Sequence, residues 1–523
     1  MHFFFFFSLF YLQLSQESPL LTWLRELQST TEVESLSALQ SKSIASTPES
    51  FEALSIRNAQ VAIQQVRSQS SSLIDDLDSL IDSLPVATQQ SLEYLYELFY
   101  RTYQRIYSVI EICRRKGCDF SQNRHISHQV IQLCEHSLQL LSIIEGDHYH
   151  VNNAQIEASI RKLKEVFGEL VDITIRKECA LLVNSLSKKS SSLCIKWSLL
   201  ALWQLTQDDP YMCRLFIEQR GIVSCLLDIV ENFCASTNLS EISQIKAAGF
   251  RVLTYLCSNS NAVKDIRQAI IERNCLSKIS LKDNNEAVLK NIVALLVQLT
   301  TPFVEFKRDD TEDVNEIVKF STIVARNTLS PHIFLMACAA LANVTFIDTD
   351  SLIQNDTLSV VVNAFKQRPE LNTVLLKDQV ITLLANVCQK HPLEIVSSGG
   401  LMLLLNTLVH DHSFETDPTA YIRIQQKIAT AIARLALNKS TARIIYRLHG
   451  VAKLVQLCRD SKMRLHSDAV LVASIKALKR IFISLGREPF EQLNATDLID
   501  FKMESSFYYY SAPRNAVGTK SLV

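Results

Sequence analysis

The side chains that could do chemistry are scattered along this chain and form no reactive pattern. Its 13 cysteines contain no Cys-x-x-Cys pair, the spacing that many zinc sites and dithiol redox centres use. The nearest histidine pairs stand apart from other ligands; they are His125/His128, His148/His150 and His410/His412. A P-loop, a Rossmann glycine fingerprint, a nucleophile elbow and the kinase motifs are also missing. We therefore predict a protein that is not an enzyme and uses no metal and no cofactor.

The cysteines fit the interior of helices better than a reactive site. Cys257, Cys338 and Cys388 lie within apolar helical segments. A free cysteine behaves there as a small apolar side chain, and an odd number of scattered cysteines is typical of a reducing compartment. We expect buried thiols and a cytoplasmic protein.

A short helical phrase recurs seven times: Leu or Ile, two variable residues, then a second apolar residue. Its copies lie at 202–205, 253–256, 296–299, 341–344, 384–387, 432–435 and 478–481. Their last residues are 51, 43, 45, 43, 48 and 46 positions apart, and an all-helical period in the forties is typical of armadillo and HEAT repeats. A glycine precedes an apolar helix at Gly221, Gly400 and Gly450. We expect it to allow a sharp turn between the first two helices of a repeat, which favours the armadillo type.

The composition agrees with an all-α fold. The chain has 10 glycines and 11 prolines in 523 residues, well below average usages of about 7% and 5%, so tight turns are rare. The predicted fold is an armadillo-repeat solenoid of about seven repeats, preceded by a helical N-terminal region and a short partner-binding segment. Solenoids use their extended concave surfaces to hold other chains.

The third residue of each phrase is the first candidate for binding. In an armadillo stack the helices that carry the phrase line the concave groove, where a carboxamide can bond the N–H and the C=O of an extended peptide. Arginines at this position suit carboxylates. The predicted groove residues are Gln298, Asn343, Asn386, Lys427, Arg434 and Arg480. Such a groove favours an acidic extended ligand; the alternative is that Asn343 and Asn386 brace neighbouring loops.

Charge and hydropathy exclude two classes of partner. A net charge of −1 is not that of a globally basic nucleic-acid binder. Residues 1–16 form an apolar N-terminal extension, but its apolar run is about a dozen residues long, whereas a bilayer span needs roughly 20. No nucleic-acid partner and no direct membrane insertion are therefore expected.

The remaining chain divides into four parts. Residues 17–50 combine a short amphipathic helix with an acidic strip, which is typical of a peptide that folds against a partner. Residues 52–188 form a helical N-terminal region, with helices predicted at about 53–83, 88–117, 125–145 and 154–188. The repeats occupy 189–486, and 487–523 form a flexible tail.

The tail ends in Ser521-Leu522-Val523, which fits a PDZ ligand. A hydroxyl residue at the third-last position and a small aliphatic residue at the free carboxylate are what a PDZ domain recognises when it takes a strand onto its sheet edge. Average residue usage gives this pattern by chance in roughly 3% of chains. The sequence thus predicts a PDZ-type C-terminus.

Several phrases together resemble the Inscuteable family of adaptors in oriented and asymmetric cell division, from about residue 20 to the end of the chain. At the N-terminus these are Trp23-Leu24-Arg25-Glu26-Leu27, Thr31-Glu32-Val33-Glu34 and Leu39-Gln40-Ser41-Lys42. In the repeats they are Ala339–Thr349, Lys377-Asp378-Gln379-Val380, Ile424-Gln425-Gln426-Lys427 and Ser467–Ala473.

The resemblance implies that residues 17–50 lie in the groove of the tetratricopeptide (TPR) repeats of a Pins/LGN-type spindle-orientation protein. A short helix would dock first, and basic groove residues would then hold the acidic strip. The implied binding residues are Trp23, Leu24, Leu27, Glu32, Glu34, Leu39, Gln40 and Lys42. Higher-order assembly with the TPR partner is compatible with this reading.

The second partner implied by the resemblance is a Par/Bazooka-type PDZ scaffold at the polarised cell cortex. The armadillo region and the C-terminal PDZ ligand are the candidate surfaces for it. The expected function is a non-enzymatic adaptor that joins these two proteins, cytoplasmic and recruited to the cortex. The alternative function is an importin- or catenin-like armadillo receptor for extended acidic peptides.

Overall fold

The structure, a computed structural model, is entirely helical in the residues it describes. These are 48–83, 153–186, 190–232, 239–279, 286–301, 311–371, 373–409 and 417–500, with the isolated residues 101, 132, 135 and 136. The chain divides into two compact units, Met1–Ala201 and Leu202–Val523, and each is described by itself. Within the described ranges, no helix is both long enough and apolar enough to cross a membrane.

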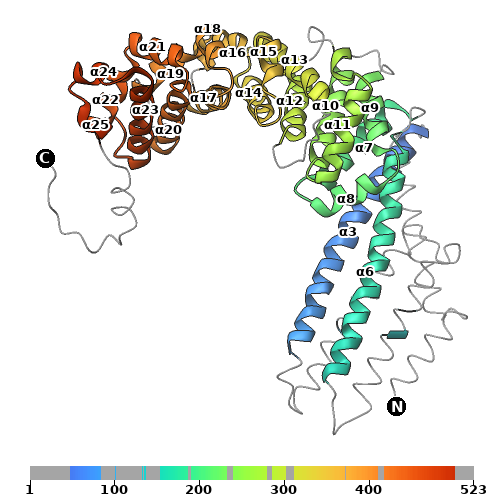
Figure 1. Ribbon diagram of the computed structural model, residues 1–523. Coiled ribbons are helices and arrows are strands. Elements are labelled where there is room, and N and C mark those ends of the chain that lie inside the picture. Colours follow the sequence, from blue (N-terminus) through green and yellow to red (C-terminus); the bar gives the residue numbers. More distant parts are fainter. Residues whose placement is uncertain are drawn as a thin grey trace, which may run out of the picture. The chain divides into compact units, whose positions relative to one another are not determined.

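The first unit contains two long helices that pack against each other, α3 (Pro48–Ser83) and α6 (Asn153–Asn184) (Figure 1). They confirm the helices predicted over 53–83 and 154–188. The helices predicted over 88–117 and 125–145 lie almost wholly outside the described residues.

One seam of α3 explains its length and its pairing. Its buried residues include a series at alternating spacings of three and four: Ile56, Ala59, Ile63, Val66, Ser70, Leu73, Leu77 and Leu80. This is the heptad pattern of a coiled-coil seam. On α6 the same spacing holds for Ile160, Leu163, Phe167, Leu170 and Thr174. Two matching seams let the helices bury one continuous apolar stripe.

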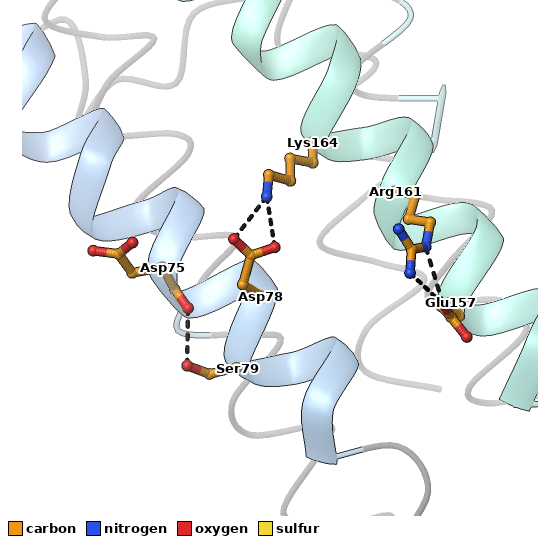
Figure 2. A network of polar contacts seen from close by, with 6 residues as sticks. All are labelled: Asp75, Asp78, Ser79, Glu157, Arg161 and Lys164. Atoms are coloured by element: carbon orange, nitrogen blue, oxygen red, sulfur yellow. Dashed lines mark hydrogen bonds and ion pairs between the residues drawn. The ribbon is translucent and has the colours of Figure 1, made fainter. Parts of the chain in front are cut away.

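Polar contacts flank that seam near the end of α3 (Figure 2). Lys164 on α6 donates to both carboxylate oxygens of Asp78 on α3, at 2.5 and 2.7 Å. Arg161 pairs with Glu157 within α6, and the hydroxyl of Ser79 donates to the carbonyl of Asp75 within α3. Both side chains of the Lys164–Asp78 pair are substantially exposed, so the pair contributes to register more than to stability.

The second unit is a stack of short helices. Helix α7 (Ser192–Thr206) crosses the boundary between the units. The helices that follow are α8 (Pro210–Glu218), α9 (Ile222–Asn232), α10 (Leu239–Leu256), α11 (Ser260–Glu272), η2 (Leu276–Lys278), α12 (Glu286–Leu299), α13 (Thr311–Asn327), α14 (Pro331–Val344), α15 (Asp350–Gln354), α16 (Thr357–Gln367), η4 (Pro369–Leu371), α17 (Val374–Val387), α18 (Pro392–Ser397), α19 (Gly400–Val409), α20 (Pro418–Leu435), α21 (Lys439–Arg447), α22 (Gly450–Arg459), α23 (Asp468–Leu485), α24 (Glu488–Glu491) and α25 (Thr496–Asp500).

Two rows of helices run through this stack. The first copy of the repeated phrase lies on α7. The six helices that carry the later copies, which we call the ladder helices, are α10, α12, α14, α17, α20 and α23, and each packs against the next. A second row packs in the order α13, α16, α19 and α22. Complete three-helix repeats are α8–α10, α15–α17, α18–α20 and α21–α23 (Figure 1). The prediction of an all-α armadillo-type solenoid is confirmed.

The repeated phrase marks the C-terminal end of its helix. Five ladder helices end at the last residue of their copy, and only α23 continues beyond it. The first and last apolar residues of all seven copies are at most 5% exposed. The phrase is therefore a core-facing turn at or near the C-terminal end of each ladder helix, which is why it recurs at the repeat period.

The turn between the first and second helices of a repeat uses a left-handed residue, as predicted, but not always the predicted glycine. Gly221 has φ +84°, and its equivalents in other repeats include Asp356 and His449, at +51° and +59°. Asp and His enter this conformation more readily than most residues. The prediction was wrong for Gly400 and Gly450, which are the first residues of α19 and α22.

Gly400 and Gly450 are needed because of close packing. A Cβ at Gly450 would lie 2.9 Å from the carbonyl oxygen of Ile445 and 2.7 Å from that residue's Cγ2. A Cβ at Gly400 would lie 3.1 Å from the carbonyl oxygen of Ile395. These two glycines let the second helix begin directly against the end of the first.

Candidate functional site on the ladder helices

All six residues predicted to line a groove lie on the ladder helices, but they do not share one environment. Gln298 and Arg480 are exposed, whereas the others are half-buried. The half-buried ones are Asn343, Asn386, Lys427 and Arg434, and each of them bonds to the preceding ladder helix.

Asn343 on α14 reaches back to the end of α12. Its Nδ2 donates to the carbonyl oxygen of Val297 at 3.3 Å and approaches Oγ1 of Thr300 at 3.5 Å. The last four carbonyls of an α-helix have no partner within the helix. Asn343 therefore caps a carbonyl at the end of the neighbouring ladder helix, which also accepts from the hydroxyls of Thr300 and Thr301.

Asn386 on α17 does the same through a hydroxyl. Its Nδ2 donates to Oγ1 of Thr345 at 2.8 Å, and this hydroxyl donates to the carbonyl of Ala342 at 2.5 Å. Ala342 is the second residue of its phrase, as Val297 is in the copy before it. The two asparagines thus serve equivalent carbonyls, one directly and one through Thr345.

Arg434 on α20 makes the third of these joints. Its Nη1 donates to the carbonyl oxygen of Ala385 at 2.6 Å, and Ala385 is again the second residue of its phrase. Three successive joints therefore use the third residue of one phrase to cap the second residue of the copy before it. We call this set the ladder joints: Asn343 to α12, Asn386 to α14 and Arg434 to α17.

The ladder joints bear on peptide binding. The donor nitrogens of Asn343 and Asn386 are used within the stack, so these amides brace neighbouring repeats. Their Oδ1 atoms accept no hydrogen bond from described residues. Capture of an extended peptide by these two residues stays a prediction, and it would have to use the oxygens.

Lys427 is also held within the stack. Its Nζ lies 2.7 Å from Oδ1 of Asp378 and 2.7 Å from Oγ1 of Thr382, both on α17. The side chains of Lys427 and Asp378 are 33% and 21% exposed. The charge of Lys427 is therefore largely matched within the molecule and adds little to a surface for acidic ligands.

Gln298 and Arg480 hold the same phrase position without such a bond. Neither side chain is hydrogen-bonded or ion-paired to a described residue. Near Arg480, the joint between α20 and α23 is made by Ser484, whose hydroxyl donates to the carbonyl of Ala436 at 2.5 Å. Of the predicted groove residues, these two have side chains free for a ligand.

The start of the ladder has a contact that the sequence did not reveal. The guanidinium of Arg251 on α10 stacks over the ring of Trp203, 4.8 Å from the ring centroid, and its Nε donates to Oδ1 of Asn291 at 3.3 Å. Cation–π stacking of this kind is worth about 0.5–2 kcal/mol. Because Trp203 and Arg251 lie in different repeats, far apart in the sequence, no sequence motif predicts this contact.

The described cysteines are free thiols, and all but Cys225 are buried. Burial raises the pKa of Cys179, Cys257 and Cys275 to about 12. Burial also raises the pKa of Cys338 and Cys388. Burial thus favours the protonated, unreactive form of these thiols at neutral pH.

Other predicted sites fall outside the described residues. These are the TPR-binding residues between Trp23 and Lys42, the PDZ-type end Ser521–Val523 and the histidine pairs. Within the described ranges, no group of three or more His, Cys, Asp or Glu side chains is placed to hold a metal ion.

Charge is distributed very unevenly along the second unit. From Pro418 to Arg487 there are fourteen Lys and Arg and two Asp, a net charge of +12 in a chain of net charge −1. This segment, which we call the basic end, comprises α20 to α23. A strongly charged region within a nearly neutral protein indicates a surface for an anionic partner.

Comparison with known proteins agrees with the family resemblance found in the sequence. The family model described as "Protein inscuteable C-terminal" matches residues 112–516. The human "Protein inscuteable homolog" is 28% identical over 386 residues, and the mouse protein of that name is 27% identical over 387. Each match covers 70% of this chain and 65% of the relative, so the chain spans somewhat less than two thirds of these relatives.

Similar solved structures are helical proteins of low sequence identity. A crystal structure of an engineered protein has a TM-score of 0.47 at 13% identity, covering 85% of this chain and 99% of that one. The crystal complex of SYS-1 and POP-1 has a TM-score of 0.47 at 10% identity, covering 88% and 90%. Neither likeness bears on function at these scores. The family model, in contrast, covers well over half of the sequence, and the chain belongs to the Inscuteable family.

Proposed function

We propose that this protein is a non-enzymatic adaptor that joins a Pins/LGN-type TPR protein to a Par/Bazooka-type cortical scaffold. Membership of the Inscuteable family is the observation that carries the proposal. The described structure fits an adaptor, because its polar ladder residues connect repeats and its buried thiols are inert.

The TPR partner would be held by the acidic strip. The residues from Trp23 to Lys42 all precede α3, the first described helix, which begins at Pro48. Glu32 and Glu34 would make charge-assisted hydrogen bonds to basic residues of a TPR groove, each worth about 1.5–3 kcal/mol. Trp23, Leu24 and Leu27 would bury one face of a short helix in the same groove.

Isothermal titration of the full chain into a Pins/LGN-type TPR domain tests this half of the proposal. We expect tight binding, and loss of more than about a hundredfold in affinity for Glu32→Ala with Glu34→Ala, because two charge-assisted bonds are removed. The pair Glu17→Ala with Glu49→Ala is the matched control, since it removes the same charge from the ends of the strip. A loss below threefold in the first pair would contradict the proposal.

The cortical partner would be held by the second unit and the C-terminus. Gln298 and Arg480 are the predicted groove residues with free side chains, and Ser521–Val523 is the PDZ-type end. Titration of the full chain and of a chain ending at Lys520 into a Par-type PDZ scaffold separates the two surfaces. We expect binding that depends on Ser521–Val523; binding that survives their loss unchanged would assign the scaffold to the armadillo surface.

A further inference from the structure

The basic end carries an exposed surface whose charges are not matched inside the molecule. Six of its exposed cationic side chains make no ion pair and no hydrogen bond with a described residue: Lys439, Arg443, Arg447, Lys462, Lys476 and Arg480. Other cations of the segment do have acidic partners, such as Lys427 with Asp378 and Arg459 with Asp497. The unmatched cations therefore form a distinct set.

The set is concentrated on two helices. Lys439, Arg443 and Arg447 are four residues apart on α21, so they lie on one face of this helix. Lys476 and Arg480 are likewise four residues apart on α23. Helices α21 and α23 pack against each other, so the two rows of cations belong to one region of the surface.

Two exposed apolar side chains lie in the same region. Leu437 is 52% exposed and Ile483 is 75% exposed. Ser484 follows Ile483 and Ala436 precedes Leu437 in the chain, and the hydroxyl of Ser484 donates to the carbonyl of Ala436. Leu437 also lies two residues before Lys439, and Ile483 lies three residues after Arg480, so cations flank the apolar pair.

Unmatched cations around exposed apolar side chains suit an anionic bilayer surface. Cations attract the headgroups, and apolar side chains enter the interface between headgroups and acyl chains. An extended acidic peptide fits less well, because it needs amides for its backbone. The two phrase residues of this region are arginines, Arg480 and Arg434, and Arg434 is used by the carbonyl of Ala385. We propose that α21 and α23 form a peripheral binding site for membranes that contain anionic phospholipids.

This contact would not span the bilayer, and it does not depend on either protein partner. Each Lys or Arg near an anionic leaflet increases the partition of a protein onto the membrane by about fivefold at physiological ionic strength. Three cations of α21 would then account for a change of roughly a hundredfold. The attraction would weaken as salt is added, because the screening length falls.

The test is sedimentation of the full chain with vesicles of phosphatidylcholine alone or with phosphatidylserine added. We expect binding only to the second kind, reduced at least tenfold by Lys439→Gln, Arg443→Gln and Arg447→Gln together. The control Arg57→Gln, Arg161→Gln and Lys162→Gln removes the same charge from exposed positions in the first unit. Circular dichroism would show that both variants remain folded.

A second variant separates a bilayer from other anions. Leu437→Ser with Ile483→Ser leaves every charge in place, so it should weaken binding to vesicles and leave binding to a polyglutamate peptide unchanged. Three outcomes would overturn the proposal: no preference for phosphatidylserine, equal losses in the α21 variant and its control, or tighter binding to polyglutamate than to vesicles. The last would assign the surface to an acidic protein partner.

Discussion

The side-chain nitrogen of Asn386 lies 2.8 Å from the hydroxyl of Thr345, and that hydroxyl donates to the carbonyl of Ala342 at the end of the previous ladder helix. This relay joins α17 to α14 through one polar chain. Asn343 and Arg434 make the neighbouring joints without an intermediate hydroxyl. The ladder residues of this protein thus act first on the stack itself.

The relay predicts a measurable coupling between Asn386 and Thr345. Asn386→Ala and Thr345→Val should each lower the free energy of unfolding by about 1 kcal/mol, since each removes a hydrogen-bonding partner. The double variant should lose less than the sum, by about 0.5–1 kcal/mol. Urea unfolding provides these values.

Gln298→Ala is the matched control for that cycle. Gln298 holds the same phrase position, but its side chain is exposed and bonds to no described residue, so its loss should change stability by less than about 0.5 kcal/mol. Additive effects of Asn386→Ala and Thr345→Val would show that the relay is not formed in solution.

A substitution in the α3–α6 seam should lower the stability of the fold far more than a substitution in the ion pair beside it. Leu77 is fully buried, so Leu77→Ala should cost about 2–5 kcal/mol. Lys164→Ala should cost less than about 1 kcal/mol, because both charges are well exposed to water. Hydrogen exchange of the α3 and α6 amides measures both, and similar losses of protection would argue against a coiled-coil seam.

Alkaline pH should weaken the fold through its buried thiols. The pKa of Cys257 is raised by burial from 9.0 to about 12, so the folded chain holds this proton more tightly than the unfolded chain. The resulting stability is complete below pH 9 and is lost as the pH rises towards 12. The urea midpoint measured from pH 8 to 11 should fall.

Cys257→Ala controls for the other groups that titrate in that range. It removes one raised pKa, so the fall in its midpoint with pH should be smaller than in the parent chain. An identical fall in both chains would mean that Cys257 does not contribute. Thiol-specific labelling at pH 8 should also spare Cys257, Cys338 and Cys388 until the chain is unfolded.

Much of the fold could be predicted because the apolar pattern repeats. A turn at or near the C-terminal end of each ladder helix puts two apolar residues in the core, and the phrase corresponds to this turn. The turns between helices were only partly predictable. Gly400 and Gly450 were expected to make these turns, but the residues with positive φ are Gly399 and His449. Gly400 and Gly450 instead begin helices, at positions where a Cβ would lie too close to the end of the preceding helix.

The candidate site was harder to predict than the fold. A carboxamide such as Asn343 can serve a peptide or a neighbouring carbonyl, and the sequence does not say which acceptor is nearer. Lys427 looked free because its partner Asp378 is 49 residues away in the chain. Contacts between repeats carry no local signature, so the sequence located these residues but did not reveal their partners.

Polar bonds between helices run along the whole ladder. The three ladder joints extend from α12 to α20, Arg251 with Asn291 joins α10 to α12, and Ser484 joins α23 to the end of α20. In a linear array each repeat is stabilised by its nearest neighbours alone. Unfolding should therefore advance from both ends as two fronts, and the repeats around α14 and α17 would be the last to exchange their amide protons.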